Sequence, residues 1–224
     1  MEQQKPSSFN RRKFVINAAK VAGVGAAGFI YFRGCKSEES ELVPPPIGKH
    51  VFLTKPYLHS ISPEQMSIRW ISNLLSYSWV KYGAADKIDQ KAVMVTDGLV
   101  NAYNRIHEIH LENLEFGKQY YYRVASKQIR TFEREDLIEY GETIYSDEYN
   151  FTTPDRNKEE LSWLVLNDIH DRPESFPLLM KMNGNDPYDF VFFYCDMFNY
   201  QTDEEQIIEH LLKSCTELFV TQKA

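Results

Sequence analysis

Two short apolar runs that each end in an aspartate constrain this chain more than any other feature. Residues 161–166 lead into Asp168, and residues 189–194 lead into Asp196. Between them, residues 174–182 have the length and apolar spacing of a short helix. A strand, a helix and a second strand at this spacing predict a βαβ unit with parallel strands and a right-handed crossover.

The same spacing predicts a metal site at one edge of the sheet. Parallel neighbours lie about 4.8 Å apart, and open α/β sheets place ligands beyond the carboxyl ends of their strands. We therefore expect Asp168, His170 and Asp196 to project into one small volume. Two carboxylates and an imidazole suit a hard or borderline divalent metal ion. The alternative is that all three are ordinary loop residues at strand ends.

Asp168-Ile169-His170 resembles the D-x-H first motif of the calcineurin-like metallophosphoesterases, and residues 192–196 resemble their second motif, an apolar strand ending in Gly-Asp. The resemblance implies that Asp168 and His170 bind one metal ion and that Asp196 bridges two divalent ions, drawn from Fe, Zn and Mn. A bridging carboxylate suits such a centre, since two-metal hydrolases hold their ions about 3.5–4 Å apart. The resemblance also implies hydrolysis of a phosphoester substrate. No separate catalytic residue is assigned.

Two positions depart from the family pattern. Cys195 stands where the family has Gly, which permits unusual dihedral angles; we expect its thiol to pack as a small buried side chain, with metal ligation as the alternative. Purple acid phosphatases have a metal-binding Tyr three residues after the second-motif Asp, whereas this chain has Asn199 there and Tyr200 one residue later. Other divalent metals are therefore at least as expected as an iron–tyrosinate site.

Residues 55–154 carry β signals throughout, because short runs rich in β-branched and aromatic residues alternate with Gly, Pro, Asn and Asp. The predicted strands are residues 56–61, 66–71, 78–83, 92–96, 105–111, 119–126 and 148–153. Seven strands in this length predict a fibronectin type III-like or immunoglobulin-like β-sandwich. Trp70 strengthens this prediction, and Leu114-x5-Tyr120 resembles the tyrosine corner of such domains. Residues 133–142 are predicted to form a solvated loop.

Four pieces of this region occur in the order KPYLHSISPEQMSIRWIS, VKYG, HLENL and QYYYRV. Together they resemble the domain that precedes the catalytic domain in purple acid phosphatases. His107 and His110 are predicted to be independent, because an odd offset along a strand directs two side chains to opposite faces. The run of three tyrosines at 120–122 is predicted to form sandwich core and rim.

Residues 1–35 have the pattern of an export signal. Arg11-Arg12, followed by Lys13-Phe14, resembles a twin-arginine motif, and residues 21–32 are an uncharged apolar run that is short for a membrane span but suits a signal peptide. We expect export to the periplasm or cell envelope; the alternative is a short N-terminal helix of a cytosolic protein. Residues 36–54 have the composition of a linker. Gly34-Cys35 resembles a lipoprotein attachment site, so membrane anchoring is expected through lipidated Cys35 or through the uncleaved N-terminal segment.

The charge distribution separates this basic start from an acidic body. Residues 1–36 hold seven Lys and Arg against one Glu, while the rest of the chain holds 18 against 31. An acidic body disfavours non-specific nucleic-acid binding, so no nucleic-acid partner is predicted. The three cysteines are too few and too irregularly spaced for a disulfide framework or a zinc finger.

Residues 158–224 are predicted to be the N-terminal fragment of an α/β metallophosphoesterase domain. Thr202 and Glu205 predict a capping box, and an apolar stripe follows at helical spacing. The Gly-Asn-His motif and the later histidines of the family do not follow Asp196. The sequence therefore predicts an exported metal-dependent phosphoesterase in a truncated, inactive form. The alternative is a non-enzymatic envelope module whose sandwich binds a partner and whose C-terminal stub is degenerate.

Overall fold

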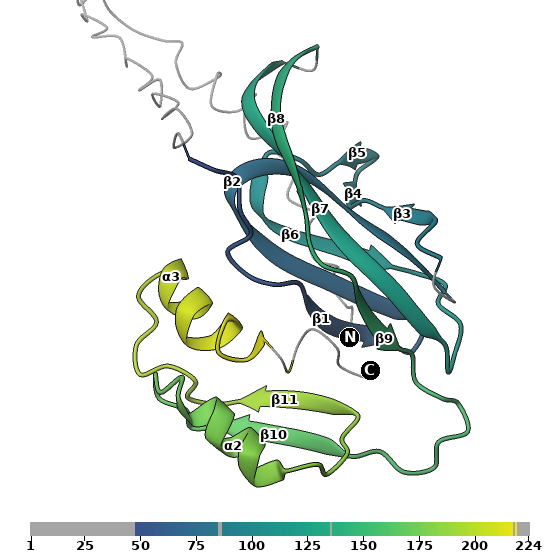
Figure 1. Cartoon of the computed structure of the whole chain (residues 1–224), viewed down its shortest axis with the longest axis vertical. Coiled ribbons are helices and arrows are strands. Elements are labelled where there is room, and N and C mark those ends of the chain that lie inside the picture. The colour runs from purple at the N-terminus through teal and green to yellow at the C-terminus, as the bar shows by residue number, and fades with distance from the viewer. Residues whose placement is uncertain (1–47, 85–86, 135, 217, 219–224) are drawn as a thin grey trace, which may run out of the picture. The chain divides into compact units, whose positions relative to one another are not determined.

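The computed structural model describes residues 48–84, 87–134, 136–216 and 218 (Figure 1). The predicted export signal, Cys35 and most of the predicted linker lie outside the described residues. Within the described part of the chain, no helix has both the length and the apolar character needed to cross a membrane.

Strands dominate the first part of the described chain, and a strand–helix–strand unit followed by a helical segment forms the rest. The elements are β1 (Tyr57–Ser62), β2 (Gln65–Ala84), β3 (Gln90–Ala92), β4 (Val95–Thr96), β5 (Leu99–Val100), β6 (Asn104–Leu111), β7 (Gln119–Arg134), β8 (Leu137–Tyr145), β9 (Tyr149–Thr152), β10 (Trp163–Asn167), α2 (Ser175–Asn183), β11 (Phe190–Tyr194), α3 (Glu204–Ile207) and the π-helix η1 (Ile208–Leu212).

The long strand β2 belongs to both layers of a β-sandwich. Its first half pairs antiparallel with β1 and β6, and its second half pairs with β3 and β7. The register with β6 shifts between Ile71 and Ser76, where the strand passes from one layer to the other. Residues 66–71 and 78–83 were predicted as separate strands, and this prediction is wrong. The intervening residues 72–77 remain extended: the backbone N–H of Asn73 donates to the carbonyl of Val51 at 3.1 Å, and residues 76–77 already pair with β7.

The sandwich core lies between the two layers. Met66, Ile68 and Trp70 of β2 face Tyr122 and Val124 of β7, and all five are almost fully buried. A tyrosine corner is present, as predicted. The hydroxyl of Tyr120 accepts a hydrogen bond of 2.9 Å from the backbone N–H of Glu115, and Leu114 is buried beside the corner.

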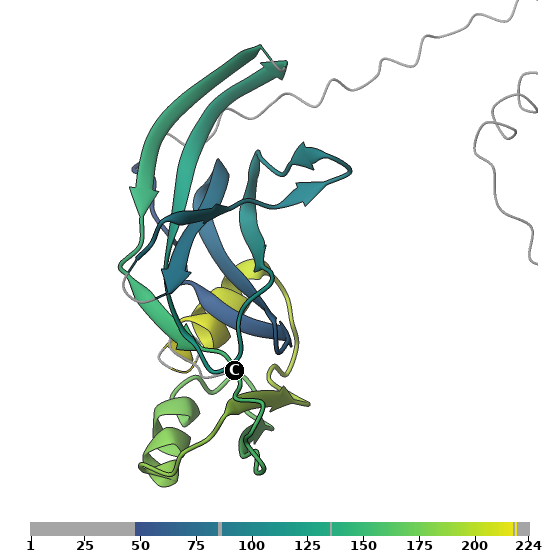
Figure 2. The same ribbon diagram turned by 90° about the vertical axis from the view of Figure 1, so that its right-hand side faces the viewer.

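Two further predictions in this region are wrong. Residues 133–142 form no solvated loop, because β7 continues to Arg134 and turns into β8, so that β7 and β8 make a long antiparallel hairpin. Figure 2 shows its two strands running side by side beyond the other strands. The strand predicted over 92–96 is divided between β3 and β4, and β4 turns at Asp97-Gly98 into β5. Both turn residues have positive φ, as a two-residue hairpin loop requires.

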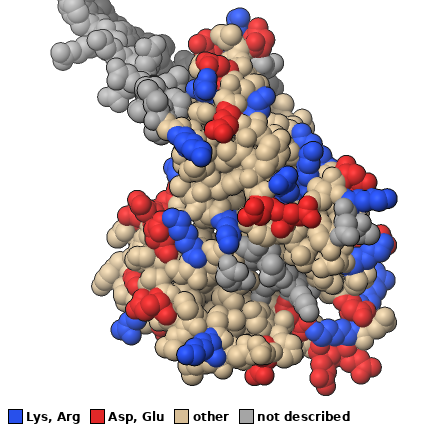
Figure 3. Space-filling view, viewed as in Figure 1, with Lys and Arg blue, Asp and Glu red and all other residues tan. Residues whose placement is uncertain are grey.

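The described surface carries a mixed charge pattern. On the face seen in Figure 3, Lys and Arg side chains are interspersed with Asp and Glu. Ion pairs such as Arg69–Glu108 at 2.7 Å and Arg130–Glu139 at 3.3 Å connect neighbouring strands of the sandwich. Exposed pairs of this kind contribute little stability, typically below about 1 kcal/mol each.

The parallel unit was predicted correctly in type. β10 and β11 pair in parallel, with Trp163 opposite Phe190 and Asn167 opposite Tyr194, and α2 connects them. One face of the pair packs against both helical segments. The buried residues of this second cluster are Leu166, Ile169, Phe176, Cys215 and Leu218. The opposite face exposes Trp163, Val165 and Phe192, because side chains alternate along a strand.

The capping box predicted at Thr202 and Glu205 is displaced by one residue. Asp203 caps α3, since its carboxylate accepts a 2.9 Å hydrogen bond from the backbone N–H of Gln206. The Gln206 side chain reaches back and accepts a 2.9 Å hydrogen bond from the backbone N–H of Thr202. Aspartate therefore takes the N-cap role assigned to threonine, while the glutamine side chain reaches one residue further back than a capping box requires, to the residue before the cap.

A buried network of histidine and serine side chains lies within the sandwich. His107 of β6 is 3% exposed and its Nε2 lies 2.9 Å from the Ser72 hydroxyl. His110, three residues later, is on the opposite face beside Glu108, as the odd offset predicted. Burial lowers the pKa of His107 to about 3, with a smaller contribution from His50, whose own pKa burial also lowers.

We predict that this network makes stability depend on pH. Because the pKa of His107 falls from 6.5 in the unfolded chain to about 3 in the folded one, its contribution is complete above pH 6.5 and is lost as the pH falls toward 3. Urea unfolding should show a loss of about 2 kcal/mol between pH 7 and pH 5 from this group. A His107→Gln variant should lose correspondingly less over the same interval, and equal losses in the two chains would contradict the assignment.

Candidate metal centre

The carboxyl ends of β10 and β11 bring the predicted ligands to one edge. Asp168 directly follows β10, and Asp196 lies two residues beyond β11. Backbone hydrogen bonds continue the pairing into the loops. The backbone N–H of His170 donates to the carbonyl of Asp196 at 2.9 Å, and that of Asp171 donates to the carbonyl of Met197 at 3.0 Å. The two loops are therefore held together by the same kind of bond that holds the strands.

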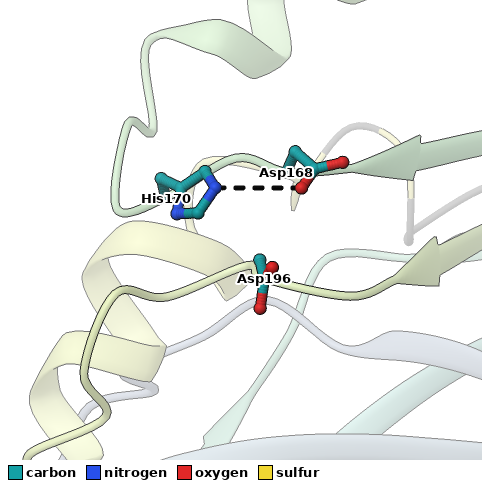
Figure 4. A group of neighbouring side chains, drawn as sticks. All are labelled: Asp168, His170 and Asp196. Atoms are coloured by element: carbon teal, nitrogen blue, oxygen red, sulfur yellow. Dashed lines mark ion pairs between the residues drawn. The ribbon is translucent and has the colours of Figure 1, made fainter.

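Asp168, His170 and Asp196 converge, as Figure 4 shows. One potential ligand atom from each side chain lies within 4.8 Å of those of the other two, and His170 Nε2 is 3.8 Å from the Asp168 carboxylate. The side chains of His170 and Asp168 are 43% and 55% exposed, so an ion from solvent has access. Ligands at about 2.1 Å from one ion lie at most about 4.2 Å apart, so small side-chain rotations would complete the fit. Metal binding at these residues stays a prediction.

Backbone strain is concentrated at the same place. Five non-glycine residues of the two loops have positive φ: Asp168 at 55°, His170 at 51°, Asp171 at 58°, Cys195 at 42° and Asp196 at 39°. Such conformations cost on the order of 1–3 kcal/mol each and persist where surrounding contacts enforce them. Aspartate tolerates this region better than most residues because its short side chain can hydrogen-bond locally.

The prediction that Cys195 packs as a buried side chain is wrong, because the residue is exposed. Its φ of 42° lies in the left-handed region that a glycine favours, so the backbone keeps the conformation expected of the family's Gly while a cysteine occupies the position with local strain. Cys215, in contrast, is buried among the apolar residues of that cluster.

Two residues that the sequence did not single out as site residues complete the polar arrangement. Asn199 Oδ1 lies 3.0 Å from His170 Nδ1. The Asp171 carboxylate accepts hydrogen bonds from the Asn199 backbone at 2.8 Å and from the Gln206 side chain at 2.7 Å, and it lies 3.3 Å from His210 Nδ1. The Asn199 N–H, with smaller contributions from His210 and Gln206, holds the pKa of Asp171 below its ordinary value. The sequence did not predict these contacts, because the partners are 28–39 residues apart and their spacing matches no local motif.

The comparison with protein families identifies the sandwich. The family described as "Purple acid Phosphatase, N-terminal domain" matches residues 54–153. Residues 54–153 form a purple acid phosphatase N-terminal domain. This domain contains the described sandwich from β1 to β9, including the tyrosine corner at Tyr120.

A search of solved structures gives the same fold for a larger part of the chain. The purple acid phosphatase PPD1 from yellow lupin (Lupinus luteus) seeds matches with a TM-score of 0.51 and 15% sequence identity, over 75% of this chain and 34% of that chain. This chain therefore spans about a third of the length of the lupin protein. A computer-redesigned β-sandwich protein matches 46% of this chain and 94% of its own at 15% identity, with a TM-score of only 0.29. A search of curated proteins found no match.

We predict that this chain binds a divalent metal ion through Asp168, His170 and Asp196. Asp168→Ala should weaken Mn²⁺ or Zn²⁺ binding by at least about tenfold, because a ligand contributes no less than the residues that orient it. Isothermal titration of the full chain measures this. Asp186→Ala is the matched control, since Asp186 is an exposed carboxylate on the loop that precedes β11, at the opposite end of the strand. Equal affinities in all three chains would contradict the prediction.

Proposed function

We propose that this chain carries the first ligands of a metal-dependent phosphoesterase centre. The observation that supports this most is the convergence of two carboxylates and an imidazole beyond a parallel strand pair, directly after a purple acid phosphatase N-terminal domain. The likeness to a purple acid phosphatase structure extends beyond the sandwich, since it covers 75% of this chain. Asp168 and His170 would hold one divalent ion, and Asp196 would be shared with a second.

The residues present suit this chemistry. The carboxylates of Asp168 and Asp196 repel each other without a cation, so a cation relieves that repulsion and stabilises both loops. When bound, the metal supplies an activated water and neutralises charge on the phosphate oxygens. The mixed nitrogen and oxygen set favours Zn, Mn or Fe over purely oxygen-bound ions. Asn199 stands at the offset where purple acid phosphatases have a tyrosine, so the proposed site has no phenolate ligand from that position.

The second candidate is a non-enzymatic envelope module in which the sandwich binds a partner. One observation favours it: among the described residues, Asp168, His170 and Asp196 are the single group of three or more His, Cys, Asp and Glu side chains close enough to share an ion. A two-metal centre that holds both the attacking and the leaving oxygen needs further ligands. Turnover by the chain therefore distinguishes the two candidates.

We predict that the chain by itself hydrolyses phosphoesters poorly. With three candidate ligands, turnover of an aryl phosphate in the presence of Mn²⁺, Zn²⁺ or Fe²⁺ should stay within about twofold of that of an Asp168→Ala, Asp196→Ala double variant. Robust turnover that the double substitution abolishes would contradict this expectation. It would mean that the remaining ligands are supplied elsewhere in the chain or by a second copy.

We also propose that the protein is exported by a twin-arginine route, because paired arginines precede an uncharged apolar run. Replacing both Arg11 and Arg12 by Lys keeps the charge and removes the paired arginines. The variant should accumulate in the cytoplasm of a bacterial host, whereas the wild-type chain should reach the periplasm or envelope, as fractionation and immunoblotting would show. Replacing Lys5 by Arg is the control, and unchanged export of the Arg11, Arg12 variant would favour the general secretory route.

A further inference from the structure

Asn199 makes two hydrogen bonds to the same residue. Its Oδ1 lies 3.0 Å from His170 Nδ1, and its Nδ2 donates to the His170 backbone carbonyl at 3.0 Å. The carbonyl can only accept, so the amide nitrogen must face it and the amide oxygen must face the imidazole. An amide oxygen is also only an acceptor, so His170 Nδ1 must carry the proton.

This proton placement determines which nitrogen can bind a cation. In a neutral imidazole with a proton on Nδ1, the free lone pair is on Nε2. His170 Nε2 is the nitrogen that lies 3.8 Å from the Asp168 carboxylate. The imidazole therefore presents its lone pair toward the carboxylates and its N–H toward Asn199.

Asn199 is itself fixed from the other side. Its backbone N–H donates to the Asp171 carboxylate at 2.8 Å, and the same carboxylate accepts from Gln206 Nε2 at 2.7 Å and pairs with His210 Nδ1 at 3.3 Å. Gln206 is the residue whose backbone N–H is capped by Asp203 at the start of α3. The side-chain amide of Asn199 is thus connected through Asp171 to the helical segment. Rotation of the loop that carries Asn199 would break its hydrogen bonds to His170 and to Asp171 together.

We propose that Asn199 is a positioning residue that fixes the Nδ1–H tautomer and the ring orientation of His170, so that Nε2 is the metal-binding atom. The metal-binding part rests on the proposed function; the tautomer part does not. In this role Asn199 occupies the offset at which purple acid phosphatases place a ligand, but it acts through His170 without binding the ion itself.

The first measurement is the tautomer of His170 in the metal-free full chain, read by long-range ¹H–¹⁵N NMR at a pH where the imidazole is neutral. His170→Gln identifies the His170 signals by their loss. The wild-type chain should show the Nδ1–H form. Asn199→Leu removes the acceptor and should shift the population toward Nε2–H, which is the form usually preferred by a free imidazole. Asn199→Asp retains an acceptor oxygen and should restore Nδ1–H.

The second measurement is metal affinity of the same chains for Zn²⁺ alone. Asn199→Leu should raise the Kd by about 10- to 100-fold, the usual effect of losing a group that orients a ligand histidine. Asn185→Leu, at an exposed asparagine on the loop that precedes β11, is the matched control and should bind as the wild type does. Far-ultraviolet circular dichroism of each variant checks that the fold is retained.

The two measurements separate the two ideas. An unchanged His170 tautomer in Asn199→Leu overturns the positioning role, whatever the metal result. A shifted tautomer in chains that bind no Zn²⁺, with wild type and Asp168→Ala behaving identically, supports the positioning of His170 and overturns the proposed function. A shifted tautomer with an unchanged Kd, in a chain where Asp168→Ala abolishes binding, overturns the assignment of Nε2 as the metal-binding atom.

Discussion

The parallel pairing of β10 with β11 is the constraint on which the candidate site depends. Hydrogen bonds between the strands set Asn167 opposite Tyr194, so the residues that follow leave the sheet at the same edge. The ladder continues past the strands, since His170 and Asp171 donate backbone N–H groups to the loop after β11. Residues separated by 28 positions, Asp168 and Asp196, thereby reach one small volume. An antiparallel pair would have sent the two aspartates to opposite ends.

Holding two carboxylates together in strained loops has a cost that the rest of the unit must offset. Like charges repel, and positive φ at five residues adds local strain. The apolar cluster below the sheet supplies the compensation. Phe176 of α2 and Leu166 of β10 are 1% and 3% exposed, and burial of such side chains contributes about 1.5–3 kcal/mol each. Strain of this kind clusters at functional sites, which agrees with the role proposed for the two loops.

The sandwich relies on a different mixture of contacts. Facing layers bury Trp70, Tyr122 and Phe151, and the indole N–H of Trp70 donates to the Ser126 hydroxyl at 3.0 Å. The same hydroxyl lies 2.7 Å from that of Ser78, which connects the apolar core to the buried histidine network. Each buried polar group in this network has a partner, so the domain retains polar side chains in its interior without a large desolvation penalty. The sandwich of this chain thus combines an aromatic core with a buried network of histidine and serine side chains.

The sequence alone determined the elements whose signals are local. Alternating and apolar runs predicted β1, β6, β9, β10 and β11. The tyrosine corner could be predicted as well, because Leu114 and Tyr120 are close in the chain. The three candidate ligands could also be predicted, because each lies within three residues of the end of a strand in a recognisable βαβ unit. Thr202 and Asp203 are both good N-cap residues, so the pattern predicted the start of α3 correctly but assigned the cap to the wrong one of the two.

Only the tertiary structure decided the features that depend on distant partners. β2 remains one strand through 72–77 because this stretch pairs with the segment around Val51 and then with β7, and 133–142 is extended because β7 and β8 pair with each other. The contact between Asn199 and His170 joins residues 29 apart whose spacing follows no motif. Cys195 is exposed and has a positive φ, neither of which its residue type predicted. Local propensity specifies which segments extend or coil, whereas pairing across the fold specifies where strands end and which polar side chains meet.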